Sequence, residues 1–299
     1  MTPPLVSVVI PVHNAADTLV EQLDAIARSQ TRAPSSEILV IDNRSTDDSA
    51  DVARRWAEAT GADLRIVAAD ERAGEPHARN VGLAAASGDF VAYCDADDRV
   101  GPDWLRSLCA LLEHHAYATG PIDTTTMNPA WIANVRGTSV TGRSIMGDDV
   151  PYAHGCNMGF RRDALVAVGG FDERYTAGCD LDIALRMWEA GHDLGYGDGA
   201  SIEYRLRPSI SATFRQGVFY GRYRVHILDR LAAHGQTVAD RRRRRMLWLV
   251  RSVPAALATR RTRARWAWVA GQLRGERLGR RDPRLEPRPV PSPVSRGVR

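Results

Sequence analysis

The sequence predicts an α/β protein built around a mostly parallel sheet, and three observations support this prediction. Short β-branched runs alternate with helical apolar spacing through the first hundred residues, as in parallel strands joined by crossover helices. The composition is that of a globular protein, with 44% hydrophobic and 25% charged residues in a chain of 299. The four cysteines form no Cys-x-x-Cys pair, so neither a disulfide framework nor a structural zinc site is expected, and a reducing compartment follows as the default.

The first hundred residues are expected to contain four strands and three helices. The strands are predicted at 6–12, 38–42, 64–68 and 90–95. The helices are predicted at 18–29, from a cap at Ser45 to about residue 60, and at 77–86. The strands are apolar along most of their length, which indicates burial on both faces.

Polar loops follow these strands, at 13–17, 42–47, 70–75 and 95–98. In open parallel sheets, ligands bind beyond the carboxyl ends of the strands. Taken singly, each loop could be no more than a helix cap or a solvated turn. Their shared position at one sheet edge favours a binding site.

The second half of the chain has a looser pattern. Helices are predicted at 104–112, 163–168 and 180–190, with a strand at 152–160. Residues 116–150 show no clear period and are expected to form loops that vary with the binding partner. In the helix at 180–190, the expected core residues are Ile183, Leu185, Met187 and Trp188.

The strand that ends at Cys94 runs directly into three carboxylates, Asp95, Asp97 and Asp98. Successive residues of an extended chain point to opposite sides, so Asp95 and Asp97 are expected to share one side of the sheet edge. Carboxylates this close repel one another unless a cation lies near them. Oxygen ligands suit Mg²⁺ or Mn²⁺, which predicts a divalent-cation site at Asp95 and Asp97.

Two common nucleotide-binding patterns are missing from the sequence. No Gly-x-Gly-x-x-Gly follows the first strand, and no Gly-Lys-Ser/Thr phosphate loop occurs. Dinucleotide cofactors and ordinary NTPase chemistry are therefore disfavoured. A hydrolase with an Asp-x-Asp nucleophile remains an alternative at this point.

Seven short motifs follow one another between residues 5 and 225. They are Val-Val-Ile-Pro-Val-His-Asn at 8–14, Val-Ile-Asp-Asn-Arg-Ser-Thr-Asp at 40–47, Ala-Arg-Asn-Val-Gly at 78–82, Asp-Ala-Asp-Asp at 95–98, Gly-Cys-Asn-Met at 155–158, Gly-Gly-Phe-Asp at 169–172 and Asp-Leu-Asp at 180–182. In this order the motifs resemble those of the family 2 glycosyltransferases. The resemblance implies the GT-A fold and transfer of a sugar from a nucleotide donor, of the UDP, GDP or dTDP type, to an acceptor hydroxyl.

The resemblance also implies roles for residues on the donor side. Pro11, His13 and Asn14 would line the pocket for the base and ribose, and Asp42 would hydrogen-bond to the base. Arg79 lies where the family places a basic residue that faces the donor.

For the reaction itself, the resemblance points to three carboxylates. Asp95 and Asp97 would hold the ribose and a metal on the diphosphate, and Asp180 would be the catalytic base. The metal would neutralise the leaving diphosphate, while the base takes the proton of the acceptor hydroxyl in one inverting displacement. The acceptor-side candidates are His154, Asn157 and Cys179. For His154, a hydrogen-bonded place at a strand end is an equal alternative.

Two departures from the family pattern follow from the sequence. Cys179 stands where the family usually has Glu, so one acidic group beside Asp180 is missing. Asp182 lies about 200° further round a helix, which predicts a capping or structural role. The segment 201–207 lacks the histidine that many relatives offer to the metal, so the remaining metal positions could be filled by phosphate and water or by Glu203 or Tyr204. The Cys179 departure keeps a second function open, an inactive nucleotide-sugar-binding or membrane-surface scaffold.

The C-terminal segment is strongly basic. Residues 241–299 contain 18 arginines and three acidic residues, a balance of +15 in a chain whose net charge is +4 and which contains no lysine. Three partners are considered for it: an anionic membrane surface, the acidic body of the same chain, and nucleic acid as the least favoured. The sequence shows neither a secretory signal nor a membrane span, so the expected location is cytoplasmic, with the inner face of the cell membrane as a second possibility.

The predicted organisation has three parts. A GT-A domain is expected at 1–230, with a nucleotide-binding half at 1–100 and an acceptor-side half at 101–230. A basic amphipathic helical extension is expected at 231–281, and a Pro/Arg-rich disordered tail at 282–299.

Overall fold

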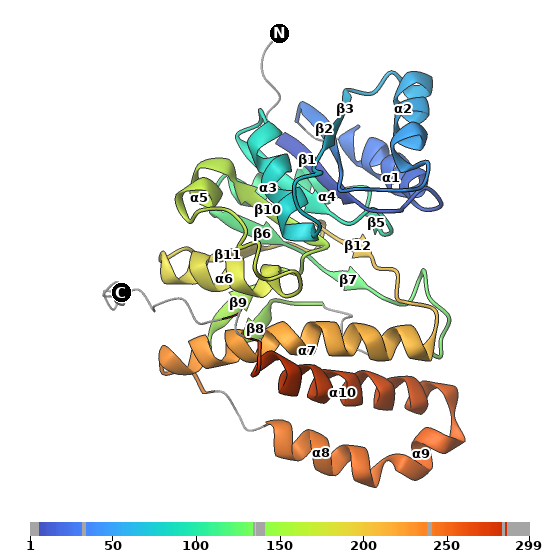
Figure 1. The fold of residues 1–299 in the computed structure, drawn as a ribbon. Coiled ribbons are helices and arrows are strands. Elements are labelled where there is room, and N and C mark those ends of the chain that lie inside the picture. The colour runs from blue at the N-terminus through green and yellow to red at the C-terminus, as the bar shows by residue number, and fades with distance from the viewer. Residues whose placement is uncertain are drawn as a thin grey trace. The chain divides into compact units, whose positions relative to one another are not determined.

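The structure is a computed structural model that describes residues 6–31, 34–133, 135, 141–237, 241–282 and 285, without the side chains of residues 241 and 242. Its contacts divide the chain into two compact units (Figure 1). The first unit comprises residues 1–123, 140–144 and 151–204, and the second comprises 124–139, 145–150 and 205–299. Most of the predicted tail at 282–299 lies outside the described residues.

The strands are β1 Val6–Val12, β2 Ser36–Asp42, β3 Leu64–Ala68, β4 Phe90–Cys94, β5 Arg99–Val100, β6 Tyr117–Thr119, β7 Ile122–Asp123, β8 Ser144–Met146, β9 Val150–Tyr152, β10 Asn157–Arg161, β11 Leu194–Tyr196 and β12 Ile202–Glu203. The helices are α1 Leu19–Gln30, α2 Ser49–Thr60, α3 Glu75–Ala85, α4 Trp104–Leu112, α5 Arg162–Ala167, α6 Cys179–Glu189, α7 Ile210–Ala233, α8 Arg241–Arg251, α9 Val253–Ala258 and α10 Arg260–Gly279.

The first unit is built on a seven-stranded sheet with the strand order β11-β6-β10-β4-β1-β2-β3. Strand β1 lies between β2 and β4 and is parallel to both, and β3 is parallel to β2. Strand β10 lies between β4 and β6 and is antiparallel to both. This confirms the predicted α/β class and the mostly parallel sheet. The register pairs Val12 with Asp42 at the carboxyl ends of β1 and β2, so the loops that follow these two strands are neighbours.

Successive side chains of β1 point to opposite faces of the sheet. Val6, Val8, Ile10 and Val12 belong to a core that also contains α1, α2 and α4 residues such as Leu23, Trp56 and Trp104. On the opposite face, α3 approaches the sheet so closely that a Cβ at Gly82 would overlap the side chain of Val9. The sheet is therefore covered by helices on both faces, as its apolar strands predict.

Three local predictions differ from the structure. Ser45 does not cap the second helix, because α2 begins at Ser49 and the Ser45 side chain accepts a hydrogen bond from the Asn14 amide, 3.1 Å away. The strand expected at 152–160 is interrupted, since β9 ends at Tyr152 and β10 begins at Asn157. The segment 116–150 includes the short strands β6, β7 and β8, which its composition did not indicate.

The second unit contains four helices in its described residues, α7 to α10. Helix α7 carries Gly217 and Gly221 and α10 carries Gly271, Gly275 and Gly279, each spaced four residues apart. A Cβ at any of these five positions would overlap a backbone atom of the other helix. The two helices therefore pack backbone to backbone, which requires residues without side chains along the contact.

Candidate active site

The loops after β1 and β2 bind each other directly at the carboxyl edge of the sheet. His13 Nδ1 lies 2.9 Å from the Asn43 carbonyl oxygen, and the Thr46 amide donates to Asn14 Oδ1 over 2.7 Å. Asn14 and Arg44 have φ angles of 53° and 65° and are the non-glycine residues in the described chain with positive φ. Strained backbone of this kind concentrates at binding sites. The predicted donor residues His13 and Asn14 therefore lie exposed on a loop held in one conformation.

Asp42 and Asn43 extend this network to the third polar loop. The Asp42 carboxylate, on the last residue of β2, accepts a hydrogen bond from the Ser45 amide over 3.0 Å. Asn43 is buried, donates to the Arg72 carbonyl oxygen over 2.7 Å and accepts from the Gly74 amide over 2.8 Å. The side chain of Asn43 thus fixes the turn that starts α3, a role that the sequence did not reveal.

Arg79 is the buried cation of the site, with 1% of its side chain exposed. It donates to the Gly155 carbonyl oxygen over 2.8 Å and to Cys179 Sγ over 3.1 Å, and it forms ion pairs with Glu75 and, at 3.5 Å, with Asp95. Burial alone would lower the pKa of Arg79, but the surrounding carboxylates, Glu75 foremost, raise it, so its charge is permanent.

Close packing at Gly155 explains the interruption between β9 and β10. A Cβ at Gly155 would lie 2.8 Å from a guanidinium nitrogen of Arg79. The carbonyl group of Gly155 binds Arg79, and its amide donates to Asp180 Oδ2 over 3.2 Å. Because both backbone polar groups of Gly155 serve the site, they are not available to a strand ladder.

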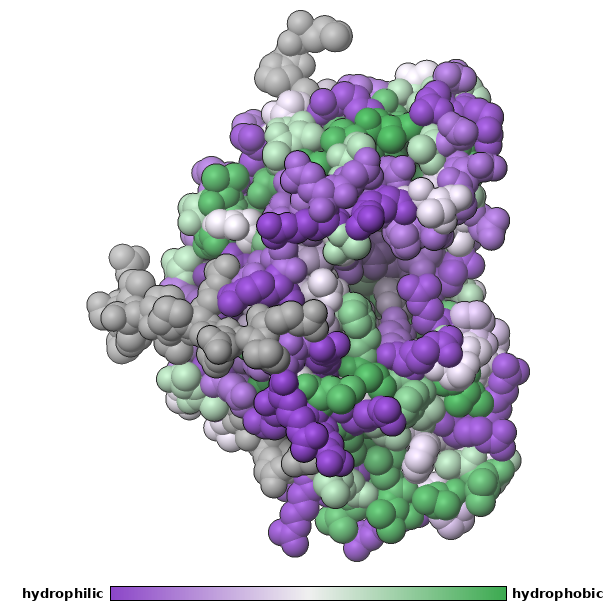
Figure 2. Space-filling model, in the orientation of Figure 1, coloured by the Kyte–Doolittle hydropathy of each residue, from purple (hydrophilic) through white to green (hydrophobic). Residues whose placement is uncertain are grey.

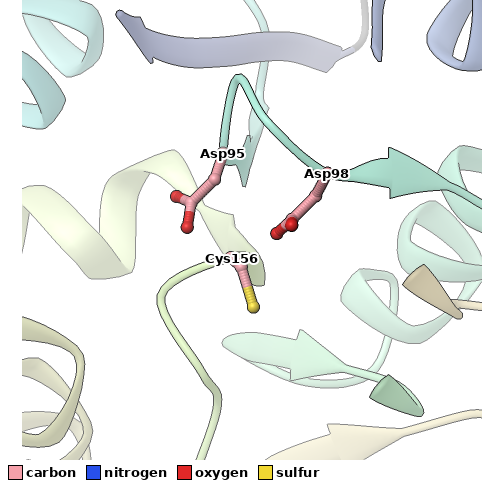
Figure 3. Close-up of side chains that lie close together, drawn as sticks. All are labelled: Asp95, Asp98 and Cys156. Carbon is pink, nitrogen blue, oxygen red and sulfur yellow. The ribbon is translucent and has the colours of Figure 1, made fainter. Parts of the chain in front are cut away.

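Asp95 lies in a cluster of acidic and thiol groups (Figure 3). Ligand atoms of Asp95, Asp98 and Cys156 all lie within 4.8 Å of one another, and Asp98 and Cys156 are buried. Burial raises the pKa of Asp95 to about 8, with a further contribution from Glu75 that outweighs the opposing effect of Arg79. Asp97, which the sequence pairs with Asp95, is partly exposed and adds to this rise. Asp98 and Cys156 are the members of the cluster to which the sequence assigned no role.

Asp180 and Asp182 lie on the first turn of α6 but have different surroundings. Asp180 is partly exposed and binds the Gly155 amide, whereas Asp182 is fully buried and pairs with Arg186 at 2.8 Å. The predicted structural role of Asp182 follows from this ion pair. Burial raises the pKa of the Cys179 thiol, so the thiol stays protonated beside Arg79.

The Gly-Gly-Phe-Asp motif is held against α3 by Asn80. Asn80 Oδ1 accepts from the Phe171 amide over 2.8 Å, and its Nδ2 donates to the Phe171 carbonyl oxygen over 2.9 Å. Gly170 has a φ of 63°, and a Cβ there would lie 2.8 Å from Asn80 Oδ1. The ring of Phe171 then lies 5.4 Å from the Arg79 guanidinium. The motif at 78–82 and the motif at 169–172 thus pack together around Arg79.

The acceptor-side candidates are placed unequally. His154 is partly exposed, and its Nε2 lies 3.0 Å from Ser144 Oγ. Asn157 is fully buried, accepts from Trp104 Nε1 over 2.8 Å and donates to the Ala200 carbonyl oxygen over 2.8 Å. We therefore assign Asn157 to the packing of the sheet. Pro11 lies partly exposed within β1, and Glu203 pairs with Arg99.

The fold has known counterparts among nucleotide-sugar enzymes. The mannosyltransferase PcManGT from Pyrobaculum calidifontis, solved in complex with GDP-Man and Mn²⁺, superposes with a TM-score of 0.57 at 22% sequence identity, over 91% of this chain and 88% of that chain. Together with the sheet and loops described above, this similarity defines the chain as a GT-A protein.

The family is shown by the sequence comparisons. The model of Glycosyl transferase family 2 matches residues 7–169, and that of Glycosyl transferase family group 2 matches residues 90–281. The chain is 31% identical over 241 residues to the glycosyltransferase AglE of Haloferax volcanii, covering 77% of each protein. It is 28% identical to the pre-mycofactocin glycosyltransferase of Mycobacterium tuberculosis, over 72% of this chain and 46% of that protein. The chain belongs to family 2 of the glycosyltransferases.

Proposed function

We propose that this glycosyltransferase moves a sugar from a nucleoside diphosphate to an acceptor hydroxyl, with inversion and with the aid of a divalent cation. The observation that carries the proposal is that two carboxylates with different surroundings lie close together. Asp95 contacts Arg79, Asp180 binds the Gly155 amide, and Arg79 binds the Gly155 carbonyl oxygen. Asp95 lies in a crowded acidic cluster that calls for a cation, and Asp180 lies partly exposed on the amide of Gly155. The first arrangement suits a metal site and the second suits a base.

The residues of the acidic cluster fit a divalent cation. Asp95 and Asp98 offer oxygen ligands, which Mg²⁺ and Mn²⁺ prefer. The burial and the neighbouring carboxylates that raise the pKa of Asp95 favour a cation beside it. Burial raises the pKa of Cys156 well above its ordinary value, so its thiol is a weak ligand beside these carboxylates. Asp95 would hold the cation with Asp97 or Asp98. When bound, the cation would neutralise charge that develops on the leaving diphosphate.

Asp180 takes the proton in this proposal. A hydroxyl is a poor nucleophile near neutral pH, so its proton must pass to a base as its oxygen bonds to the anomeric carbon. The bond from that carbon to the phosphate oxygen breaks in the same step, and the nucleoside diphosphate leaves with the bonding electrons. The Gly155 amide, 3.2 Å from Asp180 Oδ2, fixes the direction of the carboxylate.

The donor side is formed by the first two loops. His13, Asn14 and Asp42 lie beside each other at the carboxyl ends of β1 and β2, where the base and ribose of a nucleotide would bind.

Arg79 is too deeply buried for an extended contact with the donor. Its positive charge instead holds Asp95 and the Gly155 carbonyl group in place, which makes it a positioning residue.

Replacement of Asp180 tests the assignment of the base. Asp180→Asn removes the proton acceptor but keeps the shape, so transfer should fall by a factor of about 10² to 10⁴. Donor affinity, measured by calorimetry with UDP-, GDP- and dTDP-sugars and Mn²⁺, should stay near that of the unmodified protein. Asp163→Asn, at a side chain that is 76% exposed, serves as the control and should transfer normally. A normal rate in Asp180→Asn would exclude Asp180 as the base.

The cation is tested separately by binding. EDTA should weaken donor binding, and Mn²⁺ or Mg²⁺ should restore it. Equal donor affinity with and without EDTA would contradict the metal site but would leave the assignment of Asp180 untouched.

A further inference from the structure

Helices α8 and α9 of the second unit both carry exposed apolar side chains. This apolar ridge consists of Met246, Leu247, Val250, Val253 and Leu257, and Val250 and Leu257 are each 74% exposed. Within α8, Val250 comes three residues after Leu247 and four after Met246, and within α9 Leu257 comes four residues after Val253, so each helix carries its exposed apolar side chains on one side. Figure 2 shows hydrophobic side chains gathered at the lower edge of the view, where Figure 1 draws α8 and α9.

The opposite side of α8 is occupied by α10. Arg245 forms an ion pair with Glu276 at 2.7 Å, and both side chains are largely buried. Trp266 Nε1 donates to the Leu249 carbonyl oxygen over 3.1 Å, and the Arg265 guanidinium lies 5.3 Å from the Trp248 ring. These contacts fix the rotation of α8 within its unit, so the apolar ridge faces outward because the inward side is already filled.

The apolar ridge lies in a strongly basic stretch of the chain. Residues 241–263 contain nine arginines and no acidic residue. Arg244, Arg251 and Arg261 are exposed in the same stretch of chain as the ridge. Exposed apolar side chains flanked by cations are the pattern of a helix that lies in the interface of a bilayer. Each arginine near an anionic membrane contributes about 1 kcal/mol to binding.

We infer that α8 and α9 dock the enzyme on the surface of an anionic lipid bilayer. The apolar ridge would enter the headgroup region while the arginines contact lipid phosphates. Nucleic acid would satisfy the arginines but would leave the ridge in water, so it fits only half of the observations. No helix within the described part of the chain has the length and hydrophobicity needed to cross a membrane. The inferred contact therefore lies at the bilayer surface.

Vesicle sedimentation tests the inference on the full chain. The protein should sediment with vesicles of phosphatidylcholine and phosphatidylglycerol in equal parts, bind vesicles of phosphatidylcholine alone much more weakly, and be released by high salt. The double variant Val250→Glu/Leu257→Glu should lose most of this binding, because both side chains are exposed and their replacement puts charge into the bilayer. Arg244→Glu/Arg261→Glu should weaken binding to the mixed vesicles by at least about tenfold.

Matched controls separate the ridge from a general effect of charge. Val166→Glu changes a valine that is 54% exposed on α5, and Arg28→Glu changes an exposed arginine on α1. Both should bind vesicles like the unmodified protein, and circular dichroism should show all variants folded. The inference is overturned if the protein does not sediment with the mixed vesicles, or if Val250→Glu/Leu257→Glu binds them normally. It is also overturned if a DNA duplex binds more tightly than the mixed vesicles and does so equally in the ridge variant.

Discussion

The two units of the chain use arginine in opposite ways. In the first unit, Arg79 and Arg186 are buried, and each is held by a carboxylate and by a backbone carbonyl oxygen. In the second unit, Arg244 and Arg251 are exposed beside an apolar ridge. A buried cation requires fixed partners, because removal of one partner leaves an uncompensated charge. A buried arginine therefore fixes local geometry, whereas exposed arginines create a field that attracts an anionic surface.

Glycine shows a similar contrast between the units. Gly155 in the first unit admits the Arg79 guanidinium and offers its own amide and carbonyl groups to the site. Gly275 in the second unit lies against the backbone of α7, with no charged group involved. The same lack of a side chain thus serves a binding site in one unit and helix packing in the other.

After Asp180, the largest effect is expected in the acidic cluster of Asp95, Asp98 and Cys156, whose crowded carboxylates favour a bound cation. Asp95→Asn should lower kcat/KM by on the order of 100-fold or more, because a bound cation contributes several kcal/mol to such reactions. The Mn²⁺ concentration needed for half-maximal donor binding should rise in parallel.

Comparison of Asp97→Asn with Asp98→Asn should identify the second carboxylate of this site. The sequence favours Asp97, whereas the structure groups Asp98 with Asp95. The variant with the larger shift of the Mn²⁺ midpoint marks the ligand. An unchanged Mn²⁺ midpoint in Asp95→Asn would contradict the whole assignment of the cation site.

These residues show how far the sequence alone could reach. The β-branched runs predicted β1 to β4, and topology then placed their polar loops at one edge. The supporting contacts could not be predicted in the same way. Asn43 binds the turn before α3, and Asn80 binds the backbone of Phe171, which is 91 residues away in the sequence. Local periodicity carries no information about such pairs, since they depend on how loops pack after the sheet has formed.

The packing of α7 against α10 in the second unit should be sensitive to the addition of a single methyl group. Gly275→Ala improves intrinsic helix propensity by about 1 kcal/mol. In the structure, however, the added Cβ overlaps the Val218 carbonyl oxygen of α7. Separation of the two backbones should cost more than the gain, so we expect a net loss of about 1–3 kcal/mol in the free energy of unfolding, measured by urea titration. Gly142→Ala, where a Cβ meets no atom within 4 Å, is the control. A stabilised Gly275→Ala variant would show that α7 and α10 are not in backbone contact.

A smaller effect is expected when the charge of Glu75, an ion-pair partner of Arg79, is removed. Glu75 pairs with Arg79, and the same guanidinium lies beside Cys179. Glu75→Gln should lower kcat/KM by about tenfold, the effect of a lost charge-assisted hydrogen bond. The double variant Glu75→Gln/Cys179→Glu places a carboxylate beside the same guanidinium and should recover most of the activity, because Cys179 Sγ already lies 3.1 Å from Arg79. If the double variant is no better than Glu75→Gln, the position of the carboxylate matters more than its charge.

Glu37 is a buried carboxylate at the opposite end of the sheet from Asp95. Burial would raise the pKa of Glu37, as it does for Asp95, but hydrogen bonds from Ser87 and Ser7 and the contact with Arg65 outweigh it and lower the pKa. Ser7 Oγ and Ser87 Oγ each donate to Glu37 Oε1 over 2.7 Å. The protein's own hydrogen bonds and Arg65 therefore stabilise the negative charge of Glu37, whereas the surroundings of Asp95 disfavour its negative charge.

Because the pKa of Glu37 is lower in the folded protein, ionised Glu37 stabilises the fold above the pKa of an unfolded glutamate, about 4.3. That contribution is lost as the pH falls through the folded value. Glu37→Gln should reduce the free energy of unfolding at pH 7 by about 1–3 kcal/mol. The difference from the unmodified protein should shrink as the pH falls below about 4. Urea titrations across this range measure it, with Glu58→Gln on the exposed surface of α2 as the control. A difference that is independent of pH would mean that Glu37 stabilises the sheet by its shape rather than by its charge, which would remove the contrast with Asp95.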